Sequence, residues 1–312
     1  MQLVRGLHNL SQRHQGCVLT VGNYDGVHLG HQHMIGVVRS RAAELGASAT
    51  VLVFEPSSKE FIDPAGAPPR LTRWREKYRA LQAHGVDRLV TLRFDEAMRA
   101  MTPERFVEEL MVAALRVRHV VVGNDFRYGA HAGGTIESLR HAGAVYGFGV
   151  EQIEPFVFDG VRVSSTVVRE RLRGGDFEGA MRLLGRPYRM LGRVIRGKEL
   201  GRTLGFPTAN LRLMRRKSPV YGILAVLVRG VGQQAMPAVA SLGTRPTVDG
   251  KEVLLEVHVF DFAGDLYGRE IEVEFIAKLR NEEKFDSLDT MMVQMRIDAA
   301  NAREVLAKVK CG

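Results

Sequence analysis

The sequence has few cysteines and no long apolar segment. Its 312 residues include only Cys17 and Cys311, near opposite ends of the chain, which gives neither a CxxC motif nor a disulfide framework. The longest stretch without a charged residue covers only residues 230–244, whereas a membrane-spanning helix needs about 20 apolar residues. The first residues lack the apolar core of a secretory signal. We therefore expect a protein of a reducing, bacterial-type cytoplasm, without a membrane partner.

Aromatic residues are also scarce, at 7% of the chain. Lys and Arg total 44 against 35 Asp and Glu, which gives a net charge of +9 that is spread over both halves of the sequence. Nucleic-acid-binding proteins usually concentrate basic residues on one face and mix aromatic residues among them. Nucleic-acid binding is therefore the weaker hypothesis, because a dispersed excess equally fits small anionic ligands or a solvated surface.

The length predicts two domains, at roughly 100–200 residues each. In the first half, short apolar segments alternate with helical patterns, which predicts a parallel, doubly wound sheet. The expected strands are residues 17–21, 49–54, 88–92 and 119–122, and the expected helices are residues 31–45, 73–84 and 102–115. Thr102 suits a helix N-cap, and Pro103 suits the first helical position.

The pattern changes after residue 186, where closely spaced strands follow one another with Gly and Asp turns. The expected strands are residues 190–195, 223–228, 235–240, 253–260 and 270–277. This spacing predicts a small antiparallel barrel or sandwich, closed by a helix over residues 287–309. We predict an α/β domain at residues 1–186 and a mainly β domain at 187–312.

A glycine- and histidine-rich motif lies between the first predicted strand and helix, at residues 22–31 (GNYDGVHLGH). Ligands of open α/β sheets bind at such strand ends, and a helix N-terminus favours phosphate. His28 and His31 are three residues apart, so one helical turn would place both on the same side. A phosphate-binding role is favoured; the alternatives are a plain turn with surface histidines or a histidine metal pair. A dinucleotide-binding oxidoreductase is disfavoured, because no GxGxxG with a later acidic residue follows the strand.

Two further segments carry polar groups suited to phosphate chemistry. Residues 164–169 (SSTVVR) combine hydroxyls with an arginine near a predicted helix start, which could cradle an oxyanion or simply cap the helix. Residues 192–199 resemble a Walker A loop, but Glu199 stands where Ser or Thr is required, so we reject a P-loop. Thr208 and Asn210 would project to one side of an extended segment and offer oxygen ligands for Mg²⁺, unless they form only a polar turn.

These motifs together indicate a family. Residues 22–31 resemble the GxFDxxHxGH signature of nucleotidylyltransferases, with Tyr24 in the Phe position, and residues 164–169 resemble its SSTxxR element. The glycine-rich loop followed by PTAN, at residues 207–210, resembles the riboflavin kinase signature. Nearly the whole chain is similar to the bacterial bifunctional riboflavin kinase/FMN adenylyltransferases. Further matching segments follow in the family order at residues 184–188, 243–247, 255–258, 265–268 and 279–285. One departure is Ser57-Ser58, where the family commonly has His-Pro.

The resemblance implies a Rossmann-like nucleotidylyltransferase domain followed by a β-barrel riboflavin kinase domain. It implies that ATP phosphorylates riboflavin to FMN and that a second ATP adenylylates FMN to FAD. Thr208 and Asn210 would bind Mg²⁺, and Glu256 would be the kinase base, although a glutamate on such an alternating strand is by itself more typical of a solvent-facing position.

The adenylyl step needs no strong base, because the attacking phosphate is already ionised. His28, His31 and Arg169 would be its catalytic residues, by orientation and charge stabilisation. The ATP-binding residues would be Gly22, Tyr24, Asp25, His28, His31, Ser164, Ser165, Thr166, Arg169, Gly197, Gly201 and Arg202. The flavin-binding residues would be Asn124, Asp125, Phe126, Arg162, Arg280 and Glu283, with a plain core position as the alternative for Phe126. We expect only small-molecule partners and a monomer or transient homo-oligomer.

Overall fold

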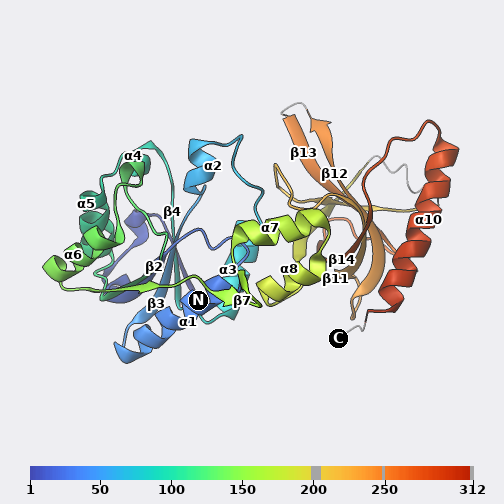
Figure 1. Cartoon of the computed structure of the whole chain (residues 1–312). Helices are drawn as coiled ribbons and strands as arrows, with labels where there is room; N and C mark the ends of the chain where they lie inside the picture. The colour runs from blue at the N-terminus through green and yellow to red at the C-terminus, as the bar shows by residue number, and fades with distance from the viewer. Residues whose placement is uncertain (198–204, 248–249, 310–312) are drawn as a thin grey trace. The chain divides into compact units, whose positions relative to one another are not determined.

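The chain consists of two compact units in the computed structural model (Figure 1), which describes residues 1–197, 205–247 and 250–309. The first unit comprises Met1–Pro68 and Trp74–Ser164, and the second comprises Pro69–Arg73 and Ser165–Gly312. The short segment Pro69–Arg73 thus groups with the second unit although it lies within the sequence of the first. The predicted boundary at residues 186/187 stays a prediction.

The first unit is built on a six-stranded parallel sheet of order β1-β4-β3-β2-β5-β6. Its strands are β1 (Gln2–Arg5), β2 (Cys17–Val21), β3 (Ser48–Phe54), β4 (Arg88–Leu92), β5 (His119–Gly123) and β6 (Gly149–Ile153). Neighbouring residues of β2 belong to core clusters on opposite faces of the sheet. Leu19 belongs to the same cluster as the helical segment at residues 106–114, whereas Val18 belongs to the same cluster as α1. The sheet is therefore covered on both faces, which confirms the predicted doubly wound α/β domain.

The helices of this unit are α1 (Leu29–Glu44), α2 (Ser58–Ile62), α3 (Trp74–Ala83), α4 (Glu96–Arg99), α5 (Pro103–Arg105), a π-helical segment (Phe106–Ala114) and α6 (Ile136–Tyr146). The three predicted helical regions of this unit are present close to their expected bounds, whereas α2, α4 and α6 were not predicted. Thr102 caps α5 by accepting a hydrogen bond from the Arg105 amide at 3.3 Å, and Pro103 occupies the first position, as predicted. The departures are that α1 begins earlier than expected and that the helix after α5 widens into π geometry.

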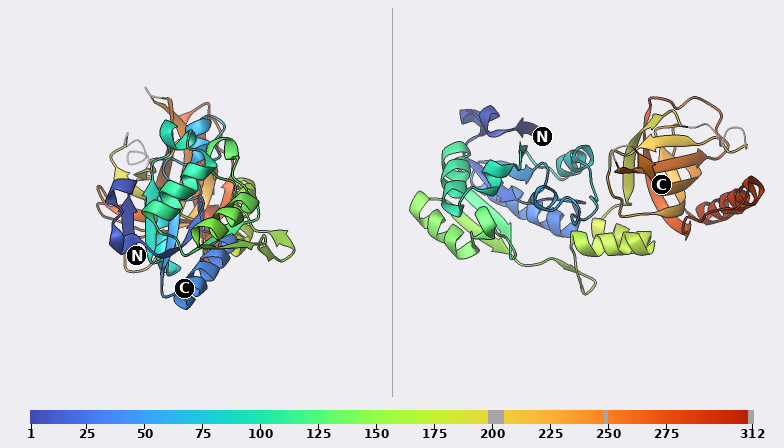
Figure 2. Two further views of the ribbon diagram at one scale, coloured as in Figure 1. Left: turned by 90° about the vertical axis from the view of Figure 1, so that its left-hand side faces the viewer. Right: turned by 90° about the horizontal axis from the view of Figure 1, so that it is seen from above.

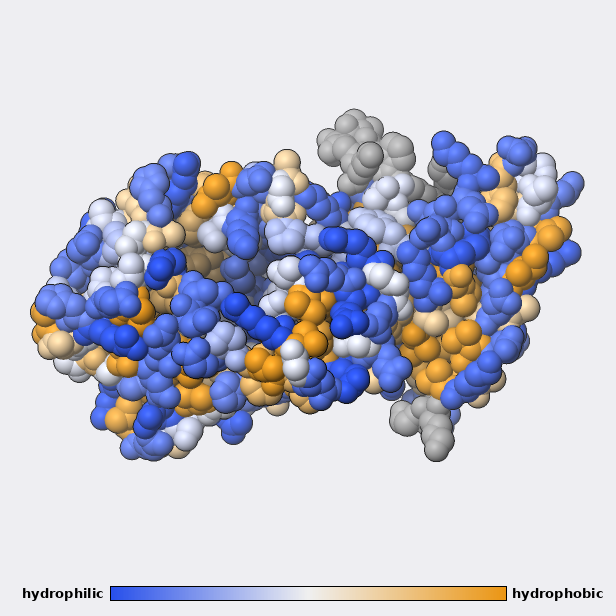
Figure 3. All heavy atoms as spheres, viewed as in Figure 1, coloured by the Kyte–Doolittle hydropathy of each residue, from blue (hydrophilic) through white to orange (hydrophobic). Residues whose placement is uncertain are grey.

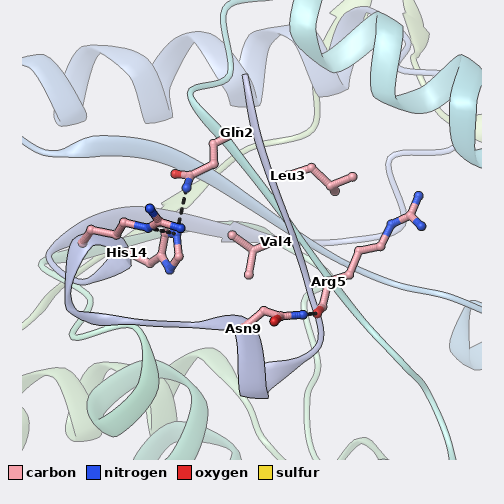
Figure 4. Close-up of a pocket in the computed structure, with 7 residues that line it drawn as sticks. Gln2, Leu3, Val4, Arg5, Asn9 and His14 are labelled. Carbon is pink, nitrogen blue, oxygen red and sulfur yellow. Dashed lines mark hydrogen bonds between the residues drawn. The ribbon is translucent and has the colours of Figure 1, made fainter.

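The edge strand β1 borders a solvent-open cavity of about 440 Å³ (Figure 4). Gln2 and His14 point toward each other across it, with 2.8 Å between Nε2 of each side chain, whereas Leu3 and Arg5 point to the other face of the strand. His14 is buried, and its carbonyl accepts a 2.8 Å hydrogen bond from Arg88 of β4. These contacts fasten the segment after β1 to the sheet, so we assign the cavity a structural role.

The second unit contains a closed antiparallel barrel of order β10-β13-β12-β11-β14-β9, with β9 also pairing with β10. Its strands are β9 (Arg189–Ile195), β10 (Ala209–Arg212), β11 (Gly222–Arg229), β12 (Met236–Thr247), β13 (Gly250–Val259) and β14 (Glu270–Arg280). Its helices are α7 (Ser165–Gly174), α8 (Phe177–Leu184) and α10 (Leu288–Ala307). A closed barrel with a C-terminal helix confirms the predicted second domain.

Helix α10 packs on the outside of the barrel (Figures 1 and 2). Ala302 and Leu306 join a buried cluster with Ala225, Leu227 and Phe260 of the barrel unit. Hydrophilic residues dominate the face shown in Figure 3. Among the described residues, none of the helices combines the length and the apolar character needed to cross a membrane.

Candidate active sites

The motif of residues 22–31 lies at the carboxyl end of the central strand β2, where it turns into α1. His28 is the N-cap of α1, with an extended backbone, and its Nδ1 accepts a hydrogen bond from the His31 amide at 3.3 Å. Because Nδ1 is the acceptor, the proton of a neutral His28 ring resides on Nε2. The fold thus places a hydrogen-donating imidazole at a helix N-terminus, where phosphate is favoured.

The two histidines form one stacked unit. Their ring centroids are 3.7 Å apart with an interplanar angle of 17°, and the Tyr24 ring is 4.8 Å from that of His31. Tyr24 is buried, and its hydroxyl contacts Thr20 Oγ1 at 2.7 Å. Burial raises the pKa of Tyr24, so its phenol stays protonated. Glycine suits position 22 because a Cβ there would approach the Tyr24 ring to 3.2 Å.

The environment of His31 favours its uncharged form. Burial, followed by the nearby charges of His28 and Lys77, lowers the pKa of His31 well below its ordinary value. The buried His31 Nδ1 has no hydrogen-bond partner within the described part of the chain. A buried polar atom in this state usually meets a ligand or ordered water. Lys77, which is 6% exposed on α3, was not identified from the sequence, because its position in an amphipathic helix gives no functional signal.

The metal alternative for His28 and His31 gains no support from the geometry. Among the described residues, no group of three or more His, Cys, Asp or Glu side chains is arranged to hold a metal ion.

The run at residues 164–169 forms the start of α7, which begins at Ser165. A Cβ on Gly30 would lie 3.3 Å from the Val163 carbonyl, so the chain just before Ser164 passes the first turn of α1. Arg169 donates from Nε to the Pro69 carbonyl at 2.7 Å. The binding of ATP by Ser165, Thr166 and Arg169 stays a prediction.

The predicted flavin residues of the first unit follow β5. Asn124 and Asp125 are exposed, and Asp125 forms a 3.4 Å ion pair with Arg162. Phe126 is half-buried, packs against the main core cluster and lies 5.6 Å from the Tyr128 ring. The structure thus brings Asp125 and Arg162 together and gives Phe126 a packing contact. Their binding of FMN stays a prediction.

In the barrel, a predicted metal ligand and the predicted base lie on neighbouring strands. Asn210 of β10 is directly opposite Glu256 of β13, and Ser241 of β12 is opposite Glu256 on its other side. Side chains of directly opposite residues project from the same face of a sheet. The other face of β13 is the buried one, with Val253, Leu255, Val257 and Val259. The strand alternation therefore turns Glu256 to the outer face of the barrel, together with Asn210 and Ser241.

Asn210 is buried, and a Cβ on Gly197 would collide with its amide group. The close approach explains why glycine stands at position 197, beside the predicted metal ligand. Gly201 and Arg202, which were also predicted to bind ATP, lie outside the described residues.

A cavity of about 260 Å³ opens between the barrel and α10. It brings together four residues predicted from the sequence: Thr208, Glu256, Arg280 and Glu283. Its apolar wall consists of Phe206, Ile223, Val239, Ala240, Phe285, Met291 and Met295, and its other polar residues are Ser241, His258, Glu282 and Asp298. Apolar walls with a few converging polar groups are typical of small-molecule sites.

Several residues of this cavity were not identified from the sequence. His258 contacts the Pro207 carbonyl through Nδ1 at 2.9 Å, and Ser241 donates to Glu282 at 3.3 Å. Asp298 is a buried acidic residue in the middle of α10, and its burial is not visible in the sequence alone. Ser241 could be identified as a site residue only from its position opposite Glu256 on the neighbouring strand. That position depends on the strand pairing, which is not visible in the sequence alone.

The first unit is a parallel α/β domain with a glycine- and histidine-rich turn at a strand end, and the second is a barrel whose cavity is lined by carboxylate and hydroxyl side chains. This combination is typical of a two-domain nucleotide-dependent transferase. Family models described as FAD synthetase and riboflavin kinase match residues 10–167 and 184–306. The chain belongs to the bifunctional riboflavin kinase/FMN adenylyltransferase family.

The relatives that support this assignment match over nearly their whole length. The bifunctional riboflavin kinase/FMN adenylyltransferase of Pseudomonas fluorescens is 48% identical, over 98% of this chain and 98% of its own. The protein of that name from Escherichia coli K12 is 47% identical, over 99% of each chain, and that of Haemophilus influenzae is 44% identical, over 97% and 98%.

A solved structure is also similar to this chain. It is described as a macrolide-efflux protein from Streptococcus pneumoniae, has a TM-score of 0.80 and 29% sequence identity, and is matched over 97% of this chain and 99% of its own. The likeness in fold therefore extends over both domains.

Proposed function

We propose that this chain phosphorylates riboflavin to FMN in the barrel domain and adenylylates FMN to FAD in the parallel-sheet domain, with ATP as the donor in both steps. The observation that carries the kinase half is the strand pairing of Asn210 with Glu256. Glu256 in turn lines the same cavity as Thr208. The matches to the FAD synthetase and riboflavin kinase family models support the adenylylation and kinase activities, respectively.

In the kinase step, the ribityl hydroxyl of riboflavin attacks the γ-phosphorus of ATP, and ADP leaves. An alcohol must lose its proton in this attack, so we assign Glu256 as the general base. Arg280 and Glu283, which line the same cavity, would contact the flavin.

Magnesium belongs to the same proposal. Thr208 and Asn210 offer hard oxygen donors, and the buried amide of Asn210 lies opposite the carboxylate-bearing Glu256, so the donor set fits a divalent cation shared with phosphate. When bound, Mg²⁺ would neutralise charge on the phosphate oxygens.

In the adenylyl step, a phosphate oxygen of FMN attacks the α-phosphorus of ATP, and pyrophosphate leaves. His28 and His31 would donate hydrogen bonds to the triphosphate, and Ser165, Thr166 and Arg169 would also bind ATP. Further ATP-binding residues would be Gly22, Tyr24, Asp25 and Ser164, and FMN would contact Asn124, Asp125, Phe126 and Arg162.

We also propose that the protein acts in the cytoplasm, as a monomer or transient homo-oligomer, without a nucleic-acid or membrane partner. The dispersed positive charge supports small anionic substrates rather than a polyanionic partner.

The decisive experiment incubates the purified chain with riboflavin, ATP and Mg²⁺ and separates the flavins by chromatography. We expect FMN to appear first and FAD to follow. If FAD forms only when FMN is supplied, the kinase half of the proposal is wrong. If FMN accumulates without FAD, the adenylylation half is wrong.

A further inference from the structure

Arg280, at the end of β14, is held by several contacts at the cavity. Its Nε donates to Asp298 Oδ1 at 2.9 Å, and its Nη2 donates to Asp298 Oδ2 at 2.7 Å. Its Nη1 donates to the Asn281 carbonyl at 2.9 Å. A bidentate arginine–carboxylate pair of this kind fixes the plane of the guanidinium as well as its position.

Asp298 belongs to α10, and its side chain is almost fully buried, at 6% exposure. Gln294, one turn earlier, also donates to Asp298 Oδ1, at 3.0 Å. The carboxylate therefore has partners on both oxygens before any ligand binds. The hydrogen bonds to Asp298 raise the pKa of Arg280 and keep it charged.

The pairing leaves part of the guanidinium available to a ligand. A guanidinium has five N–H groups. Three of them donate to Asp298 and Asn281, and Nη1 also forms an ion pair with the more exposed Glu283 at 3.9 Å, which is longer than a hydrogen bond. The second N–H of Nη2 and the second N–H of Nη1 thus make no hydrogen bond among the described residues. The guanidinium carbon also lies 5.7 Å from the centre of the Phe285 ring, which lines the same cavity.

We infer that Asp298 is a positioning residue for the kinase substrate: it holds Arg280 so that the remaining N–H groups face an uncharged, carbonyl-bearing aromatic ligand in the cavity. The inference rests on the proposed riboflavin kinase function. The buried pair also cancels its own charge, so the cavity accepts a neutral flavin without an uncompensated arginine.

The competing explanation is that Asp298 only fastens α10 to the barrel. A second ion pair separates the two explanations, because Arg303 of the same helix forms a bidentate pair with Asp261 at 2.8 and 2.9 Å. The described residues that line the cavity include neither Asp261 nor Arg303. Asp261→Asn therefore weakens another link between α10 and the barrel without removing a side chain that lines the cavity, although Asp261 also interacts electrostatically with His258 of the lining.

The experiment compares Asp298→Asn, Arg280→Lys and Asp261→Asn in the full-length chain. It measures KM for riboflavin and for ATP, kcat, the Kd for riboflavin from flavin fluorescence, and the thermal midpoint. We expect Asp298→Asn and Arg280→Lys each to raise KM and Kd for riboflavin about tenfold, with KM for ATP changed less than about twofold. Asp261→Asn should leave KM and Kd unchanged.

The inference is overturned if Asp298→Asn lowers the thermal midpoint as Asp261→Asn does while the riboflavin Kd stays at the wild-type value. It is also overturned if KM for riboflavin and for ATP rise equally. Should Asp298→Asn fail to fold, an unchanged riboflavin Kd in Arg280→Lys contradicts it. Absence of FMN formation by the wild-type chain would instead contradict the proposed function.

Discussion

At the residue scale, the two sites differ in what the sequence reveals. The spacing of His28 and His31 predicts that one helical turn brings them together, and the stacked rings agree with that spacing. The contribution of Lys77 could not be predicted, because its proximity to His31 depends on how α3 packs against the sheet. Likewise, the sequence indicates Glu256 only through the family resemblance, since its neighbours Asn210 and Ser241 come from other strands.

Substitutions at the two proposed centres should affect opposite reactions. Glu256→Gln should reduce riboflavin phosphorylation by about 10²–10⁴-fold, the usual contribution of a general base, and leave adenylylation unchanged. His28→Ala should do the reverse. Each step is assayed separately, with riboflavin or FMN as the supplied flavin.

The control for this pair is Glu252→Gln, on the same strand as Glu256, where the carboxylate forms a surface ion pair with Arg212 at 3.5 Å. It should change neither rate appreciably. Equal damage to both steps by Glu256→Gln and His28→Ala would contradict the assignment of two separate sites.

The lowered pKa of His31 predicts a loss of stability in acid. Below its ordinary pKa of about 6.5, the unfolded chain binds a proton at His31 that the folded chain binds only at lower pH. Stability should therefore fall as the pH decreases below about 6.5. Denaturant unfolding, followed by the fluorescence of the single tryptophan Trp74, should show a smaller decrease in His31→Gln than in the wild type; an equal decrease would contradict the prediction.

At the scale of elements, the sequence identifies the buried strands and misses the edges. β2 and β4 are buried throughout and read as largely apolar segments. β1 and β6 form the two edges of the sheet, and their polar residues hide the strand pattern. β10 has only four residues, too few for a periodicity to be recognised. Partial exposure and short length, rather than unusual chemistry, therefore limit the prediction.

A glycine at the start of β11 should be essential to the geometry of the cavity that we propose binds the flavin. Gly222 has φ +117°, and a Cβ there would collide with the Arg280 carbonyl. Gly222→Ala should therefore lower the free energy of unfolding by about 1–3 kcal/mol and weaken riboflavin binding. Gly268→Ala is the control, because Gly268 also has a positive φ but open space around it. An equal effect of both substitutions on riboflavin Kd would argue against a steric link to Arg280.

At the scale of the whole molecule, the change in strand spacing predicts two domains, but it does not predict how the intervening segments are distributed. Residues 69–73 lie early in the sequence and group with the barrel unit. The Leu71 carbonyl accepts a hydrogen bond from the buried Tyr188 hydroxyl at 3.1 Å, and the Arg70 carbonyl accepts one from Arg215 at 2.6 Å. Such distant pairings leave no periodic signal in the sequence.

These pairings predict that a fragment of residues 184–312 is less stable than the same barrel in the full chain, because Tyr188 loses its acceptor at Leu71. A buried polar group that loses its partner costs about 1–3 kcal/mol. Tyr188→Phe should therefore destabilise the full chain, where it removes the hydrogen bond to the Leu71 carbonyl, by more than it destabilises the fragment, where that bond is already absent. Thermal unfolding of both forms, with and without the substitution, measures this difference. A loss of equal size in both would mean that the segment at residues 69–73 contributes nothing to barrel stability through Tyr188.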